Sequence, residues 1–305
     1  MKKPTPKIYR TTNWSSYNQA LIKRGNISKT QWYAQPQGKH GRNQTYSDTA
    51  IQCCLMIKSL FRLSLRMVTG FVQSLIKLCG LNWTAPDYST LCRRQKHIDI
   101  AISYQKSRDG LHLLVDSTGL KFLGEGEWKR KKHQPEYRRQ WRKLHIGIDV
   151  ETLQIRAVQL TTNNVSDSQV LGDLLDQIPL DERIDSVYTD GAYDTKCCRK
   201  VISDRQAHAV IPPRKNAKPW KDSKISSIER NELLQTVKHL GRTLWKKWSG
   251  YHRRSLVETK MHCIKLLGDK FLARSFPSQV NEIHARVAVL NRFTELGRPL
   301  TQVTP

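Results

Sequence analysis

The sequence contains few acidic residues for its size. Its 305 residues include 26 Asp and Glu against 52 Lys and Arg, which gives a formal net charge of +26. Residues 1–110 contain four Asp and no Glu, against 18 Lys and Arg. This imbalance excludes a typical near-neutral metabolic enzyme and indicates a polyanionic partner, most often a nucleic acid. An anionic membrane surface is a less favoured alternative.

Long apolar runs and paired cysteine motifs are also missing. The most apolar stretch, residues 50–81, is interrupted by four Lys and Arg residues, so it does not predict a membrane span. No apolar segment of the kind found in secretory signals follows the basic start of the sequence. The seven Cys form no C-x-x-C pair, which favours reduced thiols in a cytosolic protein. We therefore expect a cytoplasmic protein without a membrane partner.

The N-terminal region is basic and then helical in pattern. Residues 1–44 are polar and basic, and we interpret them as an arm that contains one short helix at 13–23; a loose terminus is an equal alternative. Apolar residues recur at helical spacing over residues 46–80. Within that stretch Gly70 is a candidate break, and Gly80 is a candidate residue for ending the helix.

A short basic helix is predicted next. It follows Pro86-Asp87, covers residues 89–97 and carries Arg93 and Arg94. Two or three short helices that end in a basic one are typical of a helix-turn-helix module. We therefore interpret residues 45–108 as an all-α, helix-turn-helix-like DNA-binding domain. A helical bundle with a basic face is the alternative.

From residue 109 onward the pattern changes to strands mixed with helices. Three strands are predicted in succession, and the order α-β-α-β-α follows. The predicted strands cover 111–115, 143–150, 155–160, 184–189 and 208–211, and the predicted helices cover 166–178, 195–205, 250–267 and 280–296. This order is the ribonuclease-H-like arrangement, so we expect an α/β domain over 109–300 with a mixed five-stranded sheet and flanking helices.

Two aspartates stand at the ends of predicted buried strands. Asp116 follows the strand at 111–115, and Asp190 ends the strand at 184–189. Ligands bind at strand ends in open α/β sheets, and a carboxylate is costly to bury unless it is paired or bound to metal. Two such carboxylates on neighbouring strands would repel each other unless divalent cations lay between them. Taken singly, each aspartate could instead cap a turn.

A third acid lies on the helix predicted at 250–267. At 100° per residue, four residues share an arc of about 60°: Tyr251, Arg254, Glu258 and Lys265. Apolar residues occupy the opposite side, so one face packs and the other presents an acid, two cations and a phenol. A solvated charged face is the alternative. Phosphodiester cleavage and strand transfer need this mixture, because two Mg²⁺ ions held by carboxylates can activate the attacking oxygen and stabilise the leaving one.

Two basic stretches contain interleaved aromatic residues. The segment 128–143 lies between the first two predicted strands and is rich in cations: Lys129, Arg130, Lys131, Lys132, Arg138, Arg139, Arg142 and Lys143. We expect it to grip flanking or target DNA through its phosphates, with a solvated loop as the alternative. Farther along the chain, Trp245 and Trp248 are candidates for stacking on an unpaired base, although core packing is the favoured alternative.

In these residues the chain resembles bacterial insertion-sequence transposases of the DDE type, in the branch named for insertion sequence five. That branch carries Y-x2-R-x3-E-x6-K on its last catalytic helix, and every spacing is met here by Tyr251, Arg254, Glu258 and Lys265. The sequence contexts of Asp116 and Asp190 also match. So do the segments at 141–145 and 211–217 and two segments near the N-terminus. The resemblance covers nearly the whole chain.

The resemblance implies a DNA transposase that depends on Mg²⁺. Such an enzyme binds the terminal inverted repeats of an insertion sequence, cleaves DNA at the element ends by metal-assisted hydrolysis and joins the 3′-OH ends to target DNA. By position, Asp116, Asp190 and Glu258 would be the catalytic triad and would hold two Mg²⁺ ions per active site. Mn²⁺ suits the same hard oxygen ligands.

The resemblance also implies roles for the surrounding residues. Arg254 and Lys265 would contact phosphates near the cut, and Tyr251 would contact the terminal nucleotide. Only a short basic insertion, 212–249, would precede the last catalytic helix. The partner would be double-stranded DNA, bound by a homodimer in association with the bacterial nucleoid. Two other functions stay open: a DNA-binding descendant that does not cleave, and a ribonuclease-H-like nuclease that cuts without joining.

Overall fold

The computed structural model describes residues 9–24, 31–35, 43–107, 109–122, 141–297 and 301–303. Its helices are α1 (Trp14–Arg24), α2 (Asp48–Phe61), α3 (Leu65–Leu78), α4 (Tyr88–Arg94), α6 (Asp167–Asp176), α7 (Lys196–Asp204), α8 (Ile225–Leu240), α9 (Arg242–Trp248), α10 (Ser255–Leu267) and α11 (Phe276–Leu296). Two 3-10 turns are η1 (Gly191–Tyr193) and η2 (Tyr251–Arg254). Within the described ranges, no helix combines the length and apolarity needed to cross a membrane.

The strands form one large sheet and one small one. They are β1 (Tyr9–Thr11), β2 (Leu111–Phe122), β3 (Trp141–Asp149), β4 (Ile155–Thr162), β5 (Ile184–Tyr188), β6 (His208–Val210), β7 (Lys270–Phe271) and β8 (Thr301–Val303). The large sheet has the order β4-β3-β2-β5-β6, with β7 paired to β2. β1 and β8 pair with each other, so segments from near the two ends of the chain lie side by side.

The strand directions confirm the predicted ribonuclease-H-like arrangement. β3 runs antiparallel to both of its neighbours, β2 and β4, and β5 and then β6 continue the sheet in parallel with β2. The expectation of five strands was wrong by one, because β7 adds a sixth strand, parallel to the far end of β2. A strand of two residues has no measurable periodicity, so the sequence pattern did not predict it.

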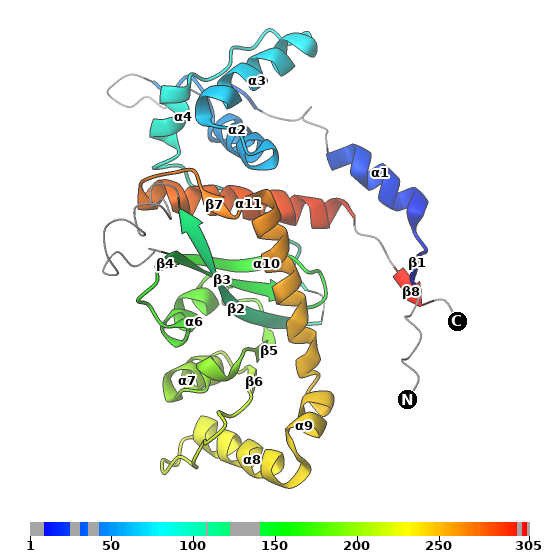
Figure 1. Cartoon of the computed structure of the whole chain (residues 1–305), viewed down its shortest axis with the longest axis vertical. Coiled ribbons are helices and arrows are strands. Elements are labelled where there is room, and N and C mark those ends of the chain that lie inside the picture. Colours follow the sequence, from blue (N-terminus) through cyan, green and yellow to red (C-terminus); the bar gives the residue numbers. More distant parts are fainter. Residues whose placement is uncertain are drawn as a thin grey trace, which may run out of the picture.

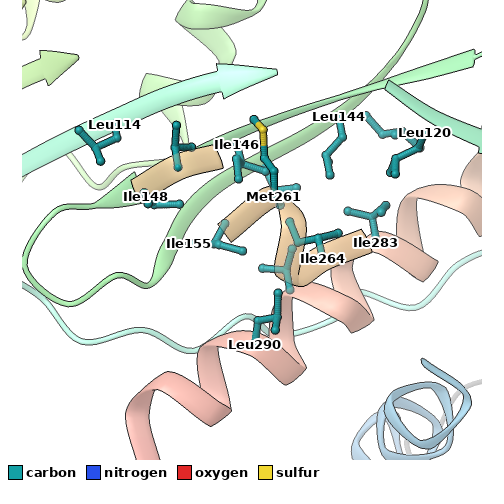
Figure 2. Packing of buried hydrophobic residues seen from close by; sticks show 14 of the residues in the cluster. Leu114, Leu120, Leu144, Ile146, Ile148, Ile155, Met261, Ile264, Ile283 and Leu290 are labelled. Carbon is teal, nitrogen blue, oxygen red and sulfur yellow. The ribbon is translucent and has the colours of Figure 1, made fainter. Parts of the chain in front are cut away.

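Helices cover both faces of this sheet (Figure 1). On one face Met261 and Ile264 of α10 and Ile283 of α11 pack against strand residues such as Ile146. Figure 2 shows these side chains interdigitating between the sheet and the two helices. On the other face α6 and α7 cover a second buried cluster. The two faces together bury the apolar strands that periodicity predicts.

A helical unit of α2, α3 and α4 packs on the far side of α11 from the sheet (Figure 1). Its core includes Ala285 and Ala288 of α11, so this one helix belongs to two clusters. Trp32, which we assigned to the arm at 1–44, is 6% exposed and stacks on Trp83 with ring centroids 5.1 Å apart. Part of the supposed arm is therefore built into the helical unit.

The helical stretch predicted at 46–80 consists of two helices. Arg62 ends α2 in the left-handed conformation with φ 52°, and the Ser64 side chain then caps α3. The prediction of a break at Gly70 was wrong, since Gly70 lies inside α3. Gly80, with φ +64°, stands just after α3, as predicted for a residue that ends a helix.

Candidate active site

Two aspartates occupy matching positions on neighbouring parallel strands. Leu114 of β2 pairs with Tyr188 of β5, and Asp116 and Asp190 each follow two residues later. Asp190 is still extended, with φ −82° and ψ 177°. Because side chains alternate along a strand, both carboxylates lie on the face that α10 covers. Neighbouring strands lie about 4.8 Å apart, so the two acids are adjacent.

The loop after Asp190 is held from two sides. The Asp190 carboxylate accepts a hydrogen bond of 2.9 Å from the Ala192 N–H and so caps η1. The guanidinium of Arg214 donates to the carbonyls of Gly191 and Ala192, at 3.1 and 3.0 Å. These bonds fix the backbone that carries the second acid.

A buried ion cluster lies behind the same loop. Asp194 is 7% exposed and accepts from Arg199 at 3.0 Å and from Arg230 at 3.1 Å. Both arginines are buried as well. This cluster has no signature in the sequence, because Arg230 is 36 residues from Asp194 and no local pattern links them. It joins α7 and α8 to the loop that carries Asp190.

Arg254 connects the first acid to the third. One terminal nitrogen of its guanidinium lies 2.5 Å from Asp116 Oδ2, and the other lies 3.1 Å from Glu258 Oε1. Burial raises the pKa of Asp116, the charge of Arg254 acts against this rise, and the charge of Asp190 adds to it. All three acids therefore share one electrostatic environment, with Arg254 as its cation.

The predicted helix at 250–267 does not begin as an α-helix. Gly250 is left-handed with φ 66°, η2 follows, and α10 starts only at Ser255. Tyr251 and Arg254 lie in the 3-10 turn, whereas Glu258 lies in the first turn of α10. The prediction assumed a constant rotation of 100° per residue, but the segment changes from a 3-10 helix to an α-helix. Arg254 and Glu258 are nevertheless in contact.

Tyr251 and Lys265, the two outer residues of the predicted motif, lie at different distances from this site. Tyr251 is half-buried with its ring centroid 5.7 Å from that of Trp245, and burial raises the pKa of its phenol. Lys246 lies 5.2 Å from the centre of the Tyr251 ring. Lys265 is half-buried on the last turn of α10. Tyr251 therefore lies close to the acids, whereas Lys265 lies about 10 Å beyond Glu258 along the axis of α10.

Of the other residues predicted to contact DNA, some are exposed and others bond to neighbouring residues of the protein. Arg93 is exposed, whereas Arg94 forms an ion pair with Asp48 and donates to the Tyr46 carbonyl, so Arg94 holds the helical unit together. Arg142 donates to the Gln279 side chain of α11 at 3.0 Å. The remaining predicted cations lie outside the described residues: Lys129, Arg130, Lys131, Lys132, Arg138 and Arg139.

The two tryptophans predicted to stack on a base differ in their exposure to solvent. Trp245 is 6% exposed and is part of the core, so the prediction that it stacks on a base was wrong. Trp248 is 71% exposed, and base stacking by its ring stays a prediction. Trp245 is the buried residue of α9, and the sequence of this short helix did not separate the two positions.

A polar cluster on the opposite face of the sheet was also missed. Lys143 Nζ lies 2.9 Å from the carboxylate of Asp167, and His145 Nδ1 lies 3.6 Å from the same oxygen. His145 Nε2 is 2.9 Å from the Thr161 hydroxyl. Ser117, next to Asp116 in β2, also hydrogen-bonds to Asp167. The helix cap at 166 and the basic segment at 141–145 were the available signals.

The donor atoms of the site suit a hard divalent cation. Asp116, Asp190 and Glu258 offer only carboxylate oxygens, the ligands that Mg²⁺ and Mn²⁺ prefer. Among the residues that the structure describes, no group of three or more His, Cys, Asp and Glu is close enough to hold a metal. Arg254 instead supplies the positive charge between Asp116 and Glu258. Coordination through Asp116 Oδ2 would require Arg254 to withdraw, and Glu258, whose side chain is 62% exposed, has room to turn.

Solved structures of transposases share features with this chain. It is similar to the piggyBac transposase synaptic complex with hairpin DNA, with 10% identity and a TM-score of 0.42 over 93% of this chain and 70% of that one. It is similar to the Drosophila P element transposase strand transfer complex (13%, TM-score 0.28, 55% of this chain and 38% of that one). The Mos1 strand transfer complex matches at 8% identity and a TM-score of 0.25, over 78% and 83%. TM-scores this low carry no argument about function.

Family models give a clearer result. A model described as Transposase DDE domain matches residues 107–292, which include Asp116, Asp190 and Glu258. A second model with the same description matches residues 22–125. Because the first model alone covers more than half of the chain, this protein belongs to the family of transposases with a DDE domain.

Proposed function

We propose that this protein is a DNA transposase of the branch named for insertion sequence five. It binds the terminal inverted repeats of its element, cleaves DNA at the element ends and joins the 3′-OH ends to target DNA. The observation that carries this proposal is the matching placement of Asp116 and Asp190, each two residues beyond the paired Leu114 and Tyr188 of parallel strands. Arg254 then joins Asp116 to Glu258. The Y-x2-R-x3-E-x6-K spacing supports the narrower assignment to that branch.

In this proposal the three carboxylates hold two Mg²⁺ or Mn²⁺ ions. When bound, the ions supply Lewis-acid activation of the attacking oxygen and stabilisation of the leaving one. Asp116 and Asp190 are fixed by the strand register, so they orient the attack, while the exposed Glu258 adjusts to the scissile phosphate. Arg254, once released from Asp116, donates its guanidinium hydrogens to phosphate oxygens.

The proposed reaction has two steps at this one site. Water attacks phosphorus at the element end, the bond to the 3′ oxygen breaks, and a 3′-OH and a 5′-phosphate result. The freed 3′-OH then attacks a target phosphodiester and displaces its 3′ oxygen, so the number of phosphodiester bonds is conserved in that step. No covalent bond to the protein forms, and no nucleoside triphosphate is consumed.

The proposal also includes an assembly and a location. A homodimer on double-stranded DNA would couple cutting at the two element ends. The net charge of +26 supports a partner as highly charged as a DNA duplex. Residues 1–108 would recognise much of the element end, and the basic segment 212–249 would border the catalytic site. The protein would act in the bacterial cytoplasm, associated with the nucleoid.

Strand cleavage and joining on duplexes that carry an element end, with Mg²⁺ present, test this proposal. Asp116→Asn, Asp190→Asn and Glu258→Gln are each expected to reduce both steps by at least about 10³-fold while leaving DNA binding, because each removes several kcal/mol of transition-state stabilisation. Asp176→Asn, at an exposed position on α6, is the matched control and should react like the wild type.

Each alternative function predicts a different outcome. Full cleavage by any of the three variants contradicts the assignment of the triad. Wild-type protein that cuts but never joins is a ribonuclease-H-like nuclease. Wild-type protein that binds element ends without cutting under any divalent cation is a DNA-binding descendant.

A further inference from the structure

A groove of about 980 Å³ opens between the helical unit and the catalytic domain. One wall comprises α3, α4 and the turn before α3, and the other is the segment that joins β7 to α11. Five exposed cations line it: Arg62, Arg66, Arg93, Lys96 and Arg274. Among the described residues that line this groove there is no Asp or Glu.

These cations differ from other basic residues nearby. Arg94 forms an ion pair with Asp48, and Lys58 forms one with Glu282, so each of these cations is largely neutralised by its partner. Among the described residues, no ion pair joins any of the five groove cations to an acid. Asp87, the N-cap of α4, interacts electrostatically with Arg93 without forming an ion pair. The groove therefore concentrates positive charge that no ion pair neutralises, and these charges repel one another until an anion binds.

Local contacts hold some of these side chains in place without neutralising them. The Arg66 guanidinium lies 4.5 Å from the centre of the Tyr88 ring, which also lines the groove. Arg93 Nε donates to the Ser89 carbonyl at 3.4 Å. Such contacts reduce the side-chain entropy that binding would cost, so the charges are partly prearranged for a ligand.

Buried polar contacts fix the two walls relative to each other. Lys58 of α2 lies 3.0 Å from Glu282 of α11, and both side chains are almost fully buried. Gln95, just after α4, donates to the Ser278 carbonyl at 3.0 Å and accepts from Asn281 at its own carbonyl at 2.8 Å. The groove is thus a preformed feature of the interface and needs no rearrangement to exist.

We propose that this groove binds the phosphate backbone of a DNA duplex, an inference that rests on the proposed function. A row of cations without acids matches a regular line of phosphates. The apolar side chains of Leu65, Met67 and Leu272, which also line the groove, would face the deoxyribose rings. A duplex seated here touches both the helical unit and the catalytic domain, so the groove sets the distance between the recognised sequence and the cut.

A charge-removal series tests the groove. The triple variant Arg66→Gln, Lys96→Gln and Arg274→Gln removes one cation from each of three wall segments. The control triple, Lys77→Gln, Lys200→Gln and Lys238→Gln, removes the same charge at exposed positions outside the groove. Affinity for a 40-base-pair duplex of mixed sequence is measured against salt concentration. The groove variant is expected to lose about 2.7 from the magnitude of the slope of log K against log salt. Equal slopes for the two variants overturn the proposal.

An exposed thiol inside the groove gives a test on the wild-type protein. Cys92 lines the groove and is exposed, and Cys197 is exposed on α7, away from it. Alkylation by N-ethylmaleimide is followed by peptide mass spectrometry with and without a saturating amount of the same duplex. We expect DNA to slow alkylation of Cys92 at least fivefold and to leave Cys197 unchanged. Equal alkylation of Cys92 with and without DNA refutes the groove as a binding site.

These outcomes separate the groove from the proposed function. Wild-type protein that cleaves and joins DNA, but whose Cys92 is not protected, retains the function and excludes the groove. Wild-type protein whose Cys92 is protected, but which never cleaves, retains the groove and excludes the transposase reaction.

Discussion

At the scale of single residues, the candidate site depends on one arginine with two acidic partners. Arg254 uses different terminal nitrogens for Asp116 and Glu258. Only a planar guanidinium presents several donors in a fixed fork, so Lys is not an equivalent replacement. Asp116 lies on β2, 138 residues from Arg254 in the sequence, whereas Glu258 lies on α10, four residues after Arg254.

Arg254→Lys is therefore expected to slow Mg²⁺-dependent cleavage by about 10- to 100-fold, which corresponds to a lost charged hydrogen bond of roughly 1.5–3 kcal/mol. Single-turnover cleavage of an end-bearing duplex measures the effect. Arg253→Lys, at the exposed neighbouring position, is the control. Equal rates for the wild type and Arg254→Lys would show that the bridging geometry is dispensable.

Another residue-scale prediction concerns pH. Burial lowers the pKa of His145 to about 4, with Asp167 acting to raise it and Lys143 to lower it. Between about pH 4 and 6.5 the unfolded chain binds more protons at this position than the folded one, so the free energy of unfolding falls on acidification through that window. The loss reaches roughly 3 kcal/mol by pH 4. His145→Gln should flatten this part of the stability profile measured by urea unfolding.

A profile of equal steepness in wild type and His145→Gln contradicts this assignment. His284, whose pKa burial also lowers, contributes to both proteins equally and so cancels in the comparison.

At the scale of elements, two glycines are expected to respond oppositely to replacement by alanine. Gly250 is left-handed and starts the 3-10 turn that carries Arg254, whereas Gly70 lies inside α3 with open space around it. A β-carbon strains the first position and only restricts the unfolded chain at the second. The start of α10 therefore depends on backbone conformation as well as on side-chain pattern.

Gly250→Ala should lower the free energy of unfolding by about 1 kcal/mol or more, and Gly70→Ala should raise it by about 0.5–1 kcal/mol. Chemical denaturation measures both changes. The Gly250 variant should also lose cleavage activity, because its turn positions Arg254. Changes of the same sign in the two variants would contradict this account.

At the scale of the whole molecule, α11 joins the two halves. Its residues Ile283 and Val287 pack toward the sheet, and Ala285 and Ala288 pack into the helical unit. The buried pair of Lys58 with Glu282 ties α2 to the same helix. The helical unit and the catalytic domain are therefore expected to unfold together.

Glu282→Gln leaves Lys58 and Arg286 buried without their acidic partner. We expect a loss of roughly 3–5 kcal/mol and a single melting transition lowered by about 10 °C. Glu295→Gln removes the acid from an exposed pair on the same helix and should change stability by less than about 1 kcal/mol. Two separate transitions in differential scanning calorimetry would mean that α11 does not couple the halves.

Periodicity and composition are local properties of the sequence, so they sufficed to predict the order of the main strands and helices, the acids at the strand ends and the excess of positive charge. They did not determine which cations are free. Arg93 and Arg94 are neighbours of equal charge, yet among the described residues only Arg94 of the two forms an ion pair, with Asp48, 46 residues away on α2. The bridge from Arg254 to Asp116, the burial of Trp245 and the groove beside α11 likewise depend on contacts between distant segments. Only the packing of those segments decides them, since a charge or an apolar surface is neutralised or buried by whatever the fold places next to it.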